Sequence, residues 1–255
     1  MTKELRQRII TSVLLFLFVI FCIFINYAIF FITVIIVSYF AFDEISFIIY
    51  RIIRSISNWK HLVFNSVSIF YAFGIFSATA IGIYRLSGPV FFLYILSICI
   101  CSDLGGYIIG KTIGGKKLTK ISPKKTISGS IGSFCFSILP LLIFNNFDKS
   151  EYLYSVNNFL FCLELSLVSQ LGDLFISYLK RKAKVKDTGK ILPGHGGLLD
   201  RIDGIIFAVP FAYIYTIGIN NYFDIWIEAI PYTLKSQLKK KLQYLAQLYL
   251  FENPH

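Results

Sequence analysis

Long apolar runs separated by short polar loops make up most of this chain of 255 residues. A helix needs about 20 mainly apolar residues to span a bilayer. The run from Ile9 to Phe42 is too long for one span, so we expect two helices that turn near Asn26. A short turn is expected at 85–89, between two later spans. The other spans are expected at about residues 62–84, 90–109, 127–144, 156–179 and 205–222. The pattern predicts an all-α, polytopic integral membrane protein with about seven to nine transmembrane helices.

Basic residues are concentrated in three of the polar loops, at residues 51–61, 111–125 and 180–201. With the N-terminus inside, all three loops face the cytoplasm, in agreement with the positive-inside rule. The formal charge is +11, but its confinement to short loops favours membrane topology and an anionic ligand over a nucleic-acid-binding face. We therefore expect no nucleic-acid partner. We expect a protein of a bacterial-type cytoplasmic (inner) membrane, with its active site facing the cytoplasm.

The composition supports one membrane domain. Charged residues make up 15% of the chain, whereas a soluble domain carries about 25%. Residues 1–223 are expected to form a single polytopic domain, whose catalytic loop at the cytoplasmic face is 173–204. Residues 224–255, with lysines among Leu and Tyr, are typical of a cationic amphipathic tail. Either an eighth element returns the chain to the cytoplasm before this tail, or the tail is an extension on the other side.

One glycine-rich segment has two interpretations. Residues 105–112, GGYIIGKT, match the spacing G-x-x-x-x-G-K-T of a nucleotide-binding P-loop. That loop works where a buried strand precedes it and a helix follows, whereas here an apolar span precedes it and a lysine-rich loop follows. We favour the alternative, in which Gly106, Gly110 and Gly114 allow close helix packing.

Asp173 lies inside an apolar run, where a carboxylate is costly and therefore indicates a site. Ser177 lies one helical turn further on, and Lys180 and Arg181 lie two turns further on, so all four share one face. A divalent cation or a lysine removes the cost of burying the charge. The alternative to a functional site is an Asp173–Lys180 contact that only satisfies two charges.

The stretch from Lys180 to Gly204 is the long polar segment of the chain. Its turn at 193–197, PGHGG, exposes backbone N–H groups that suit phosphate oxygens. His195 in this turn either binds a phosphate or caps the turn. Asp200 and Asp203, three residues apart, lie on one helical face and are placed to share Mg²⁺, which prefers carboxylates together with substrate phosphates.

This stretch resembles the signature of the phosphatidate cytidylyltransferases (CDP-diacylglycerol synthases), which runs S-x-x-K-R-x-x-x-x-K-D and then P-G-H-G-G-x-x-D-R-x-D. The matching residues are Ser177, Lys180, Arg181, Lys186, Asp187, 193–197, Asp200, Arg201 and Asp203. A second family segment is matched in part, by Asp103, Tyr107, Ser122, Pro123, Lys125, Thr126 and Gly129. Lys124 stands where the family has a glycine, and Ser128 where it has a glutamate, which bears on substrate positioning.

The resemblance implies a nucleotidyltransferase of phospholipid biosynthesis that converts CTP and phosphatidic acid to CDP-diacylglycerol and pyrophosphate. It also implies an all-helical homodimer among membrane lipids, with Mg²⁺, and K⁺ as a second metal, held near Asp173 and Asp200. The implied catalytic residues are Asp173, Lys180, Arg181, Lys186 and Asp200. The implied substrate-binding residues are Asp103, Ser122, Lys125, Thr126, Ser177, Asp187, His195, Gly196, Gly197, Arg201 and Asp203. For Arg201 and Asp203, orienting the metal ligands is the alternative role.

Two other functions stay open at this point. A transporter or channel would use the intramembrane Asp103 and Asp173 to line a pathway, although the chain shows no repeated halves. A CTP-dependent cytidylyltransferase that acts on a different lipid phosphate would use nearly the same site.

Overall fold

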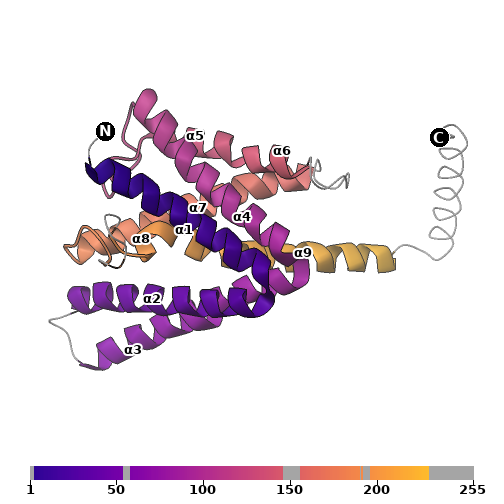
Figure 1. Cartoon of the computed structure of the whole chain (residues 1–255), viewed down its shortest axis with the longest axis horizontal. Helices are drawn as coiled ribbons and strands as arrows, with labels where there is room; N and C mark the ends of the chain where they lie inside the picture. The colour runs from indigo at the N-terminus through magenta and orange to yellow at the C-terminus, as the bar shows by residue number, and fades with distance from the viewer. Residues whose placement is uncertain (1–2, 54–57, 146–155, 190, 192–195, 230–255) are drawn as a thin grey trace, which may run out of the picture. The chain divides into compact units, whose positions relative to one another are not determined.

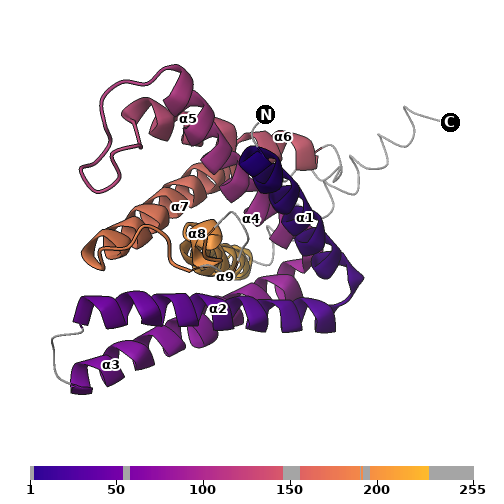
Figure 2. The same ribbon diagram turned by 60° about the vertical axis from the view of Figure 1, so that its left-hand side comes forward.

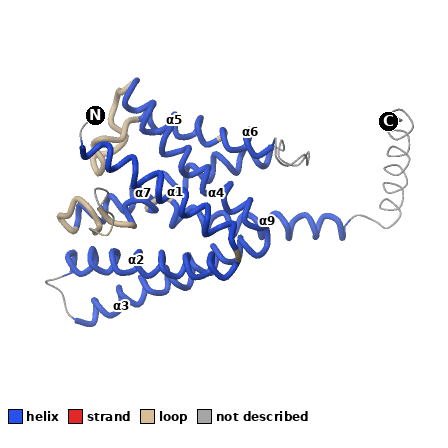
Figure 3. The backbone as a smooth tube through the Cα atoms, in the orientation of Figure 1, coloured by secondary structure: helices blue, strands red, loops and turns tan. Residues whose placement is uncertain are grey.

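The computed structural model describes residues 3–53, 58–145, 156–189, 191 and 196–229. Every regular element in this part of the chain is helical, which confirms the predicted all-α class (Figures 1 and 3). The helices are α1 (Lys3–Ile25), α2 (Tyr27–Ile53), α3 (Asn58–Ile69), α4 (Ala78–Thr112), α5 (Ile127–Ser137), α6 (Leu139–Asn145), α7 (Val156–Lys182), α8 (Leu199–Ile202) and α9 (Ile205–Ala229). A π-helical turn, Phe70–Ser77, joins α3 to α4.

The long N-terminal apolar run is divided at the predicted residue. Helix α1 ends at Ile25 and α2 begins at Tyr27. The side-chain oxygen Oδ1 of Asn26 accepts a hydrogen bond from the Ile29 N–H at 2.8 Å. Asn26 therefore acts as an N-cap, which satisfies one of the amides that has no partner within the first turn of a helix.

The turn predicted at 85–89 is a kink inside α4. Gly88 has φ +82°, a left-handed conformation that glycine adopts without strain, and Pro89 follows it. Proline has no N–H to donate and suits the first turn of a helix, so the helical path resumes at once. The two spans expected on either side, 62–84 and 90–109, thus follow one another across this kink without an intervening loop.

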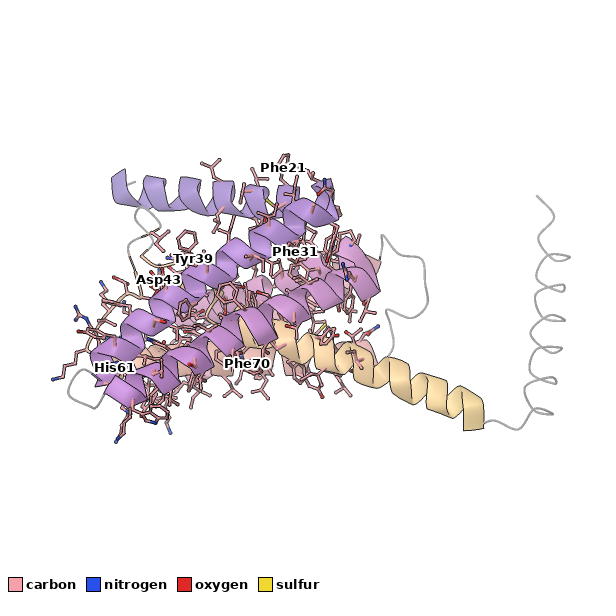
Figure 4. The ribbon with its side chains drawn as sticks, turned by 90° about the horizontal axis from the view of Figure 1, so that it is seen from below. Phe21, Phe31, Tyr39, Asp43, His61 and Phe70 are labelled. Carbon is pink, nitrogen blue, oxygen red and sulfur yellow. The ribbon has the colours of Figure 1, made fainter. Side chains whose placement is uncertain are left out.

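Membrane-spanning character is spread over several helices. Among the described residues, four are long and apolar enough to cross a membrane: Tyr27–Ile53, Trp59–Thr112, Ile127–Phe144 and Asn157–Lys182. Shorter apolar helices cover Leu14–Ile25 and Ile205–Gly218. Large apolar side chains such as Phe21, Phe31 and Phe70 are exposed (Figure 4). Exposed apolar surface of this extent is typical of a polytopic membrane protein; the count of about seven to nine spans stays a prediction.

Helices α4 and α5 pack closely through small residues. A Cβ on Gly106 would lie 2.5 Å from Ser133 Oγ, and a Cβ on Gly110 would lie 3.4 Å from the Cα of Gly129. The packing interpretation of the glycine-rich segment is therefore confirmed for these two residues. It is wrong for Gly114, which has φ +64° in the loop after α4 and would meet no neighbour within 4 Å.

The described parts of the three basic loops lie at one end of the helices. The C-terminal end of α2, the N-terminal end of α3, the α4–α5 loop and the C-terminal end of α7 gather on the left in Figure 1, and Figure 2 shows the same grouping. Successive spans therefore alternate in direction, as the predicted topology requires.

Two compact units divide the chain, residues 1–213 and 214–255, with the boundary inside α9. Helix α9 continues to Ala229 and so passes the predicted domain boundary at residue 223. Residues 230–255 lie outside the described part of the chain, and the amphipathic tail stays a prediction. The site described below belongs entirely to the first unit.

Candidate active site

A cavity of about 320 Å³ opens between α4, the α4–α5 loop, α5 and α7. Its polar lining includes Asp103, Ser122, Lys124, Lys125, Thr126, Gln170 and Asp173. Five of these were candidates from the sequence, and they come from two segments far apart in the chain. The fold thus joins the partly matched family segment to the start of the fully matched one.

An ion pair between Lys125 Nζ and Asp173 Oδ2 makes this junction. The Ser177 hydroxyl, one turn further along α7, donates a hydrogen bond to Asp173 Oδ1 at 3.3 Å. The alternative of an Asp173–Lys180 contact is wrong, because Lys125 is the lysine paired with Asp173. Lys180 still interacts with Asp173 through charge.

Lys180 is paired instead with Asp200, with 2.7 Å between Nζ and Oδ1. The other oxygen, Oδ2, accepts hydrogen bonds from Thr188 N–H at 2.8 Å and from Gly197 N–H at 3.2 Å. Burial by itself would raise the pKa of the Asp200 carboxyl, but the Lys180 ammonium and the Thr188 amide outweigh it and hold this pKa below its ordinary value. Asp200 is therefore a fixed carboxylate near neutral pH.

Asp203 faces Asp173. Its carboxyl lies within hydrogen-bonding reach of the Asp173 carboxyl and interacts through charge with Asp103. Burial, and next the negative charge of Asp173, raise the pKa of Asp203 well above its ordinary value. Two carboxyl groups in such proximity need a shared proton or a cation between them.

The predicted metal pair, Asp173 and Asp200, does not share a contact in this structure. Asp173 is paired with Lys125 and Asp200 with Lys180. The carboxyl within hydrogen-bonding reach of Asp173 is that of Asp203. Within the described ranges, no three or more His, Cys, Asp or Glu side chains are arranged to hold a metal ion. Mg²⁺ nevertheless takes only one or two protein carboxylates when substrate phosphates complete its shell. The carboxylates present fit such an ion, and both Mg²⁺ and K⁺ stay predictions.

The other predicted site residues lie around the α7–α8 segment. Arg181, Lys186, Asp187 and Arg201 are exposed at the basic end. Gly196 has φ +86°, as expected for the glycine turn, and Gly197 donates its amide to Asp200. His195 lies outside the described residues, so its role stays a prediction.

The α4–α5 loop uses its polar side chains to hold its own shape. Thr126 caps α5 by accepting a hydrogen bond from the Gly129 N–H at 3.1 Å. Ser128, at the position of the family glutamate, donates to the carbonyl oxygen of Gly114. Ser128 therefore closes the loop at its two ends and brings no charge to the cavity.

Glu44 on α2 is the residue that the sequence reasoning missed. It is buried, and it accepts hydrogen bonds from Leu198 N–H, Leu199 N–H and the Thr188 hydroxyl. The argument applied to Asp173, a carboxylate within an apolar helix, would have found it. It escaped because the apolar run was taken to end at Phe42.

Comparison with known proteins agrees with the resemblance. A model of the cytidylyltransferase family matches residues 46–217. A phosphatidate cytidylyltransferase of Rickettsia bellii is 45% identical over 140 residues, which are 51% of this chain and 61% of the relative. The Bacillus subtilis protein of that name is 41% identical over 129 residues, 49% of this chain and 47% of the relative. The one from Helicobacter pylori strain J99 is 36% identical over 148 residues, 58% of this chain and 53% of the relative.

The chain spans about half the length of these curated relatives. Since the family model covers more than half of its residues, the chain belongs to the cytidylyltransferase family.

Proposed function

We propose that the protein transfers the cytidylyl group of CTP to phosphatidic acid and releases pyrophosphate, giving CDP-diacylglycerol. The observation that carries this proposal is the presence of two lysine–carboxylate pairs, Lys125–Asp173 and Lys180–Asp200, at the basic end of a helical membrane protein. The names of the relatives supply the acceptor lipid. Membership of the cytidylyltransferase family favours an enzyme over a transporter.

The chemistry needs little from the protein as a base. The attacking phosphate monoester has a second pKa of about 6, so it is already ionised near neutral pH. The main barrier is the repulsion between two polyanions and the charge that develops on the leaving pyrophosphate. Cationic side chains lower that barrier by position and charge. Lys125 at the cavity and Lys180, which interacts through charge with the cavity residue Asp173, are placed for this role.

The two lysines are each paired with a carboxylate, and the more exposed pair, Lys125–Asp173, is the one that substrate can open. In the structure, each lysine neutralises one aspartate, so neither aspartate is left with an unpaired charge. When phosphates bind, Lys125 exchanges Asp173 for them, and Lys180 contacts them from its place beside Asp200. Asp173 and Asp200, with Asp203 close by, would be the residues that hold Mg²⁺. The ion, when bound, supplies neutralisation of phosphate charge. Arg181, Lys186 and Arg201 then complete the cationic surface around the substrate phosphates.

The same proposal includes the surroundings of the site. The cavity is lined in part by the α4–α5 loop, which lies at the end of the helices where the basic loops gather (Figure 1). This position supports an active site on the cytoplasmic side of an inner membrane. Access from that side suits CTP, and the exposed apolar helix faces suit a lipid acceptor. A homodimer, which the sequence resemblance implies, is part of the proposal.

The test is the formation of a CDP-lipid from labelled CTP by purified protein in liposomes, with Mg²⁺ present. Phosphatidic acid and an isoprenoid phosphate are compared as acceptors in one assay. Transfer to phosphatidic acid supports the proposal, and preferential transfer to the isoprenoid phosphate assigns a different acceptor. Movement of an ion or solute into the liposomes without consumption of CTP would support a transporter instead.

A further inference from the structure

A buried carboxylate from α2 holds the segment that carries Asp200. Glu44 is 2% exposed, and its two oxygens accept hydrogen bonds from the amides of Leu198 and Leu199, both at 2.9 Å. These amides belong to the start of α8, whose own N-cap residue, Leu198, has no side chain able to cap it. Glu44 therefore caps α8 from another helix, 154 residues away in the chain. It precedes the region matched by the family model.

Thr188 connects Glu44 to the Lys180–Asp200 pair. This threonine is 1% exposed, and its hydroxyl donates to Glu44 Oε2 at 2.5 Å. The same hydroxyl oxygen lies 3.0 Å from Asp200 Oδ2, which also accepts the Thr188 N–H at 2.8 Å. Asp200 in turn holds Lys180. A continuous set of hydrogen bonds thus runs from a membrane helix to the lysine proposed to contact phosphate.

The backbone around Glu44 leaves no room for other side chains. A Cβ on Gly189 would lie 2.5 Å from Glu44 Oε1, and a Cβ on Gly197 would collide with Thr188 Oγ1 and Glu44 Oε2. Glycines on both sides therefore let the chain close around the carboxylate. Gly197 also gives its amide to Asp200, so the same close approach serves both acidic residues.

We propose that Glu44 is a positioning residue for cytidylyl transfer. Through Thr188 and the first amides of α8 it fixes the carboxylate of Asp200, and with it the ammonium of Lys180. Glu44 is enclosed by protein and makes no contact with substrate. The inference rests on the proposed function for its effect on the reaction, whereas the hydrogen-bond support is a property of the protein alone.

The first experiment compares Glu44→Gln with Asp43→Asn. Asp43 is the exposed acidic neighbour on α2, labelled in Figure 4, so its variant removes a charge from the same helix without touching α8. In Glu44→Gln one of the two α8 amides faces an NH₂ group and loses its acceptor. We expect kcat to fall about tenfold or more, with the KM for CTP changed by less than about threefold. Asp43→Asn keeps both constants.

Amide hydrogen exchange, measured without nucleotide, tests the contact between Glu44 and the α8 amides independently of the reaction. Amides 196–200 should exchange faster in Glu44→Gln than in the wild type and in Asp43→Asn, while those of α4 and α5 stay unchanged. Unchanged exchange at 196–200 overturns the assignment of Glu44, and so does faster exchange throughout the protein, which would indicate general unfolding. A wild-type protein that forms no CDP-lipid overturns the proposed function instead.

The second experiment uses Thr188 as the connecting residue. Thr188→Val keeps the shape but removes the hydroxyl, and Thr188→Ser keeps the hydroxyl. We expect Val to lower kcat as Glu44→Gln does, and Ser to retain most of the activity. The double variant Glu44→Gln/Thr188→Val should lose no more activity than the more damaging single variant, because both substitutions disrupt the same hydrogen-bond network. Losses that multiply, or a Ser variant as impaired as the Val variant, overturn the proposal.

Discussion

The two lysine–carboxylate pairs of the site differ in how firmly the protein holds them. The side chains of Lys125 and Asp173 are 28% and 24% exposed and lie at the cavity, whereas those of Lys180 and Asp200 are 14% and 10% exposed. Besides its lysine, Asp173 has the Ser177 hydroxyl at 3.3 Å and the nearby Asp203 carboxyl, whereas Asp200 has two backbone amides and the Thr188 hydroxyl. The open pair is suited to exchange partners with substrate, and the enclosed pair to keep its geometry.

The largest effect is expected from the open pair. Asp173→Asn removes the carboxylate proposed to hold Mg²⁺ while it keeps the side-chain volume, so kcat should fall about 100-fold or more. Because the residue is partly exposed, the melting temperature in detergent should change little. Glu164→Gln, an exposed acid on the same helix, is the control. Activity of Asp173→Asn close to that of the control at saturating Mg²⁺ would remove Asp173 from the site.

Asp200→Asn tests the enclosed pair and should affect both activity and stability. It leaves Lys180 buried without its counter-charge, and the breaking of a buried pair costs about 3 kcal/mol. We expect kcat to fall about 10- to 100-fold, together with a melting temperature clearly below that of Asp173→Asn. Differential scanning fluorimetry and the CDP-lipid assay measure the two effects. Equal melting temperatures for the two variants would contradict the difference between the pairs.

Lys125→Met tests whether the lysine of the open pair contacts CTP. One charge-assisted hydrogen bond contributes about 1.5 kcal/mol, which corresponds to an increase of about tenfold in the KM for CTP. Lys120→Met, an exposed lysine of the same loop, is the matched control and should keep the wild-type KM. A KM for CTP that is unchanged in Lys125→Met, with kcat alone reduced, would place this lysine at the acceptor phosphate or at Asp173 only.

The fold was largely readable from the sequence because its signals are local. Asn26 caps α2, and Gly88 with Pro89 kinks α4, where turn residues interrupted the apolar pattern. For the candidate site, the sequence predicted the individual residues but not which of them contact one another. Helical spacing predicted that Lys180 lies near Asp173. The lysine paired with Asp173 is instead Lys125, which belongs to the α4–α5 loop and so could not be found from the spacing of residues along α7.

Contacts between distant segments were the part that the sequence could not supply. Glu44 meets Thr188 across 144 residues, and Asp203 rather than Asp200 comes within reach of Asp173. Both contacts depend on where α2, α7 and α8 lie relative to one another. A pattern of apolar and polar positions says which face of a helix is buried, but it does not say which other helix covers that face.

The smallest effect is expected from Ser177→Ala, which removes the remaining partner of Asp173 on α7. The Ser177–Asp173 hydrogen bond is long, and an ordinary hydrogen bond contributes about 0.5–1.5 kcal/mol net. We expect kcat/KM to fall only about two- to threefold, near the lower end of that range. The result sharpens the comparison between the pairs, because Thr188→Val removes a hydroxyl from the enclosed pair and should cost several times more. If Ser177→Ala proves as damaging as Thr188→Val, then Asp173 is held as firmly as Asp200, and the open pair would not be free to exchange its lysine for substrate.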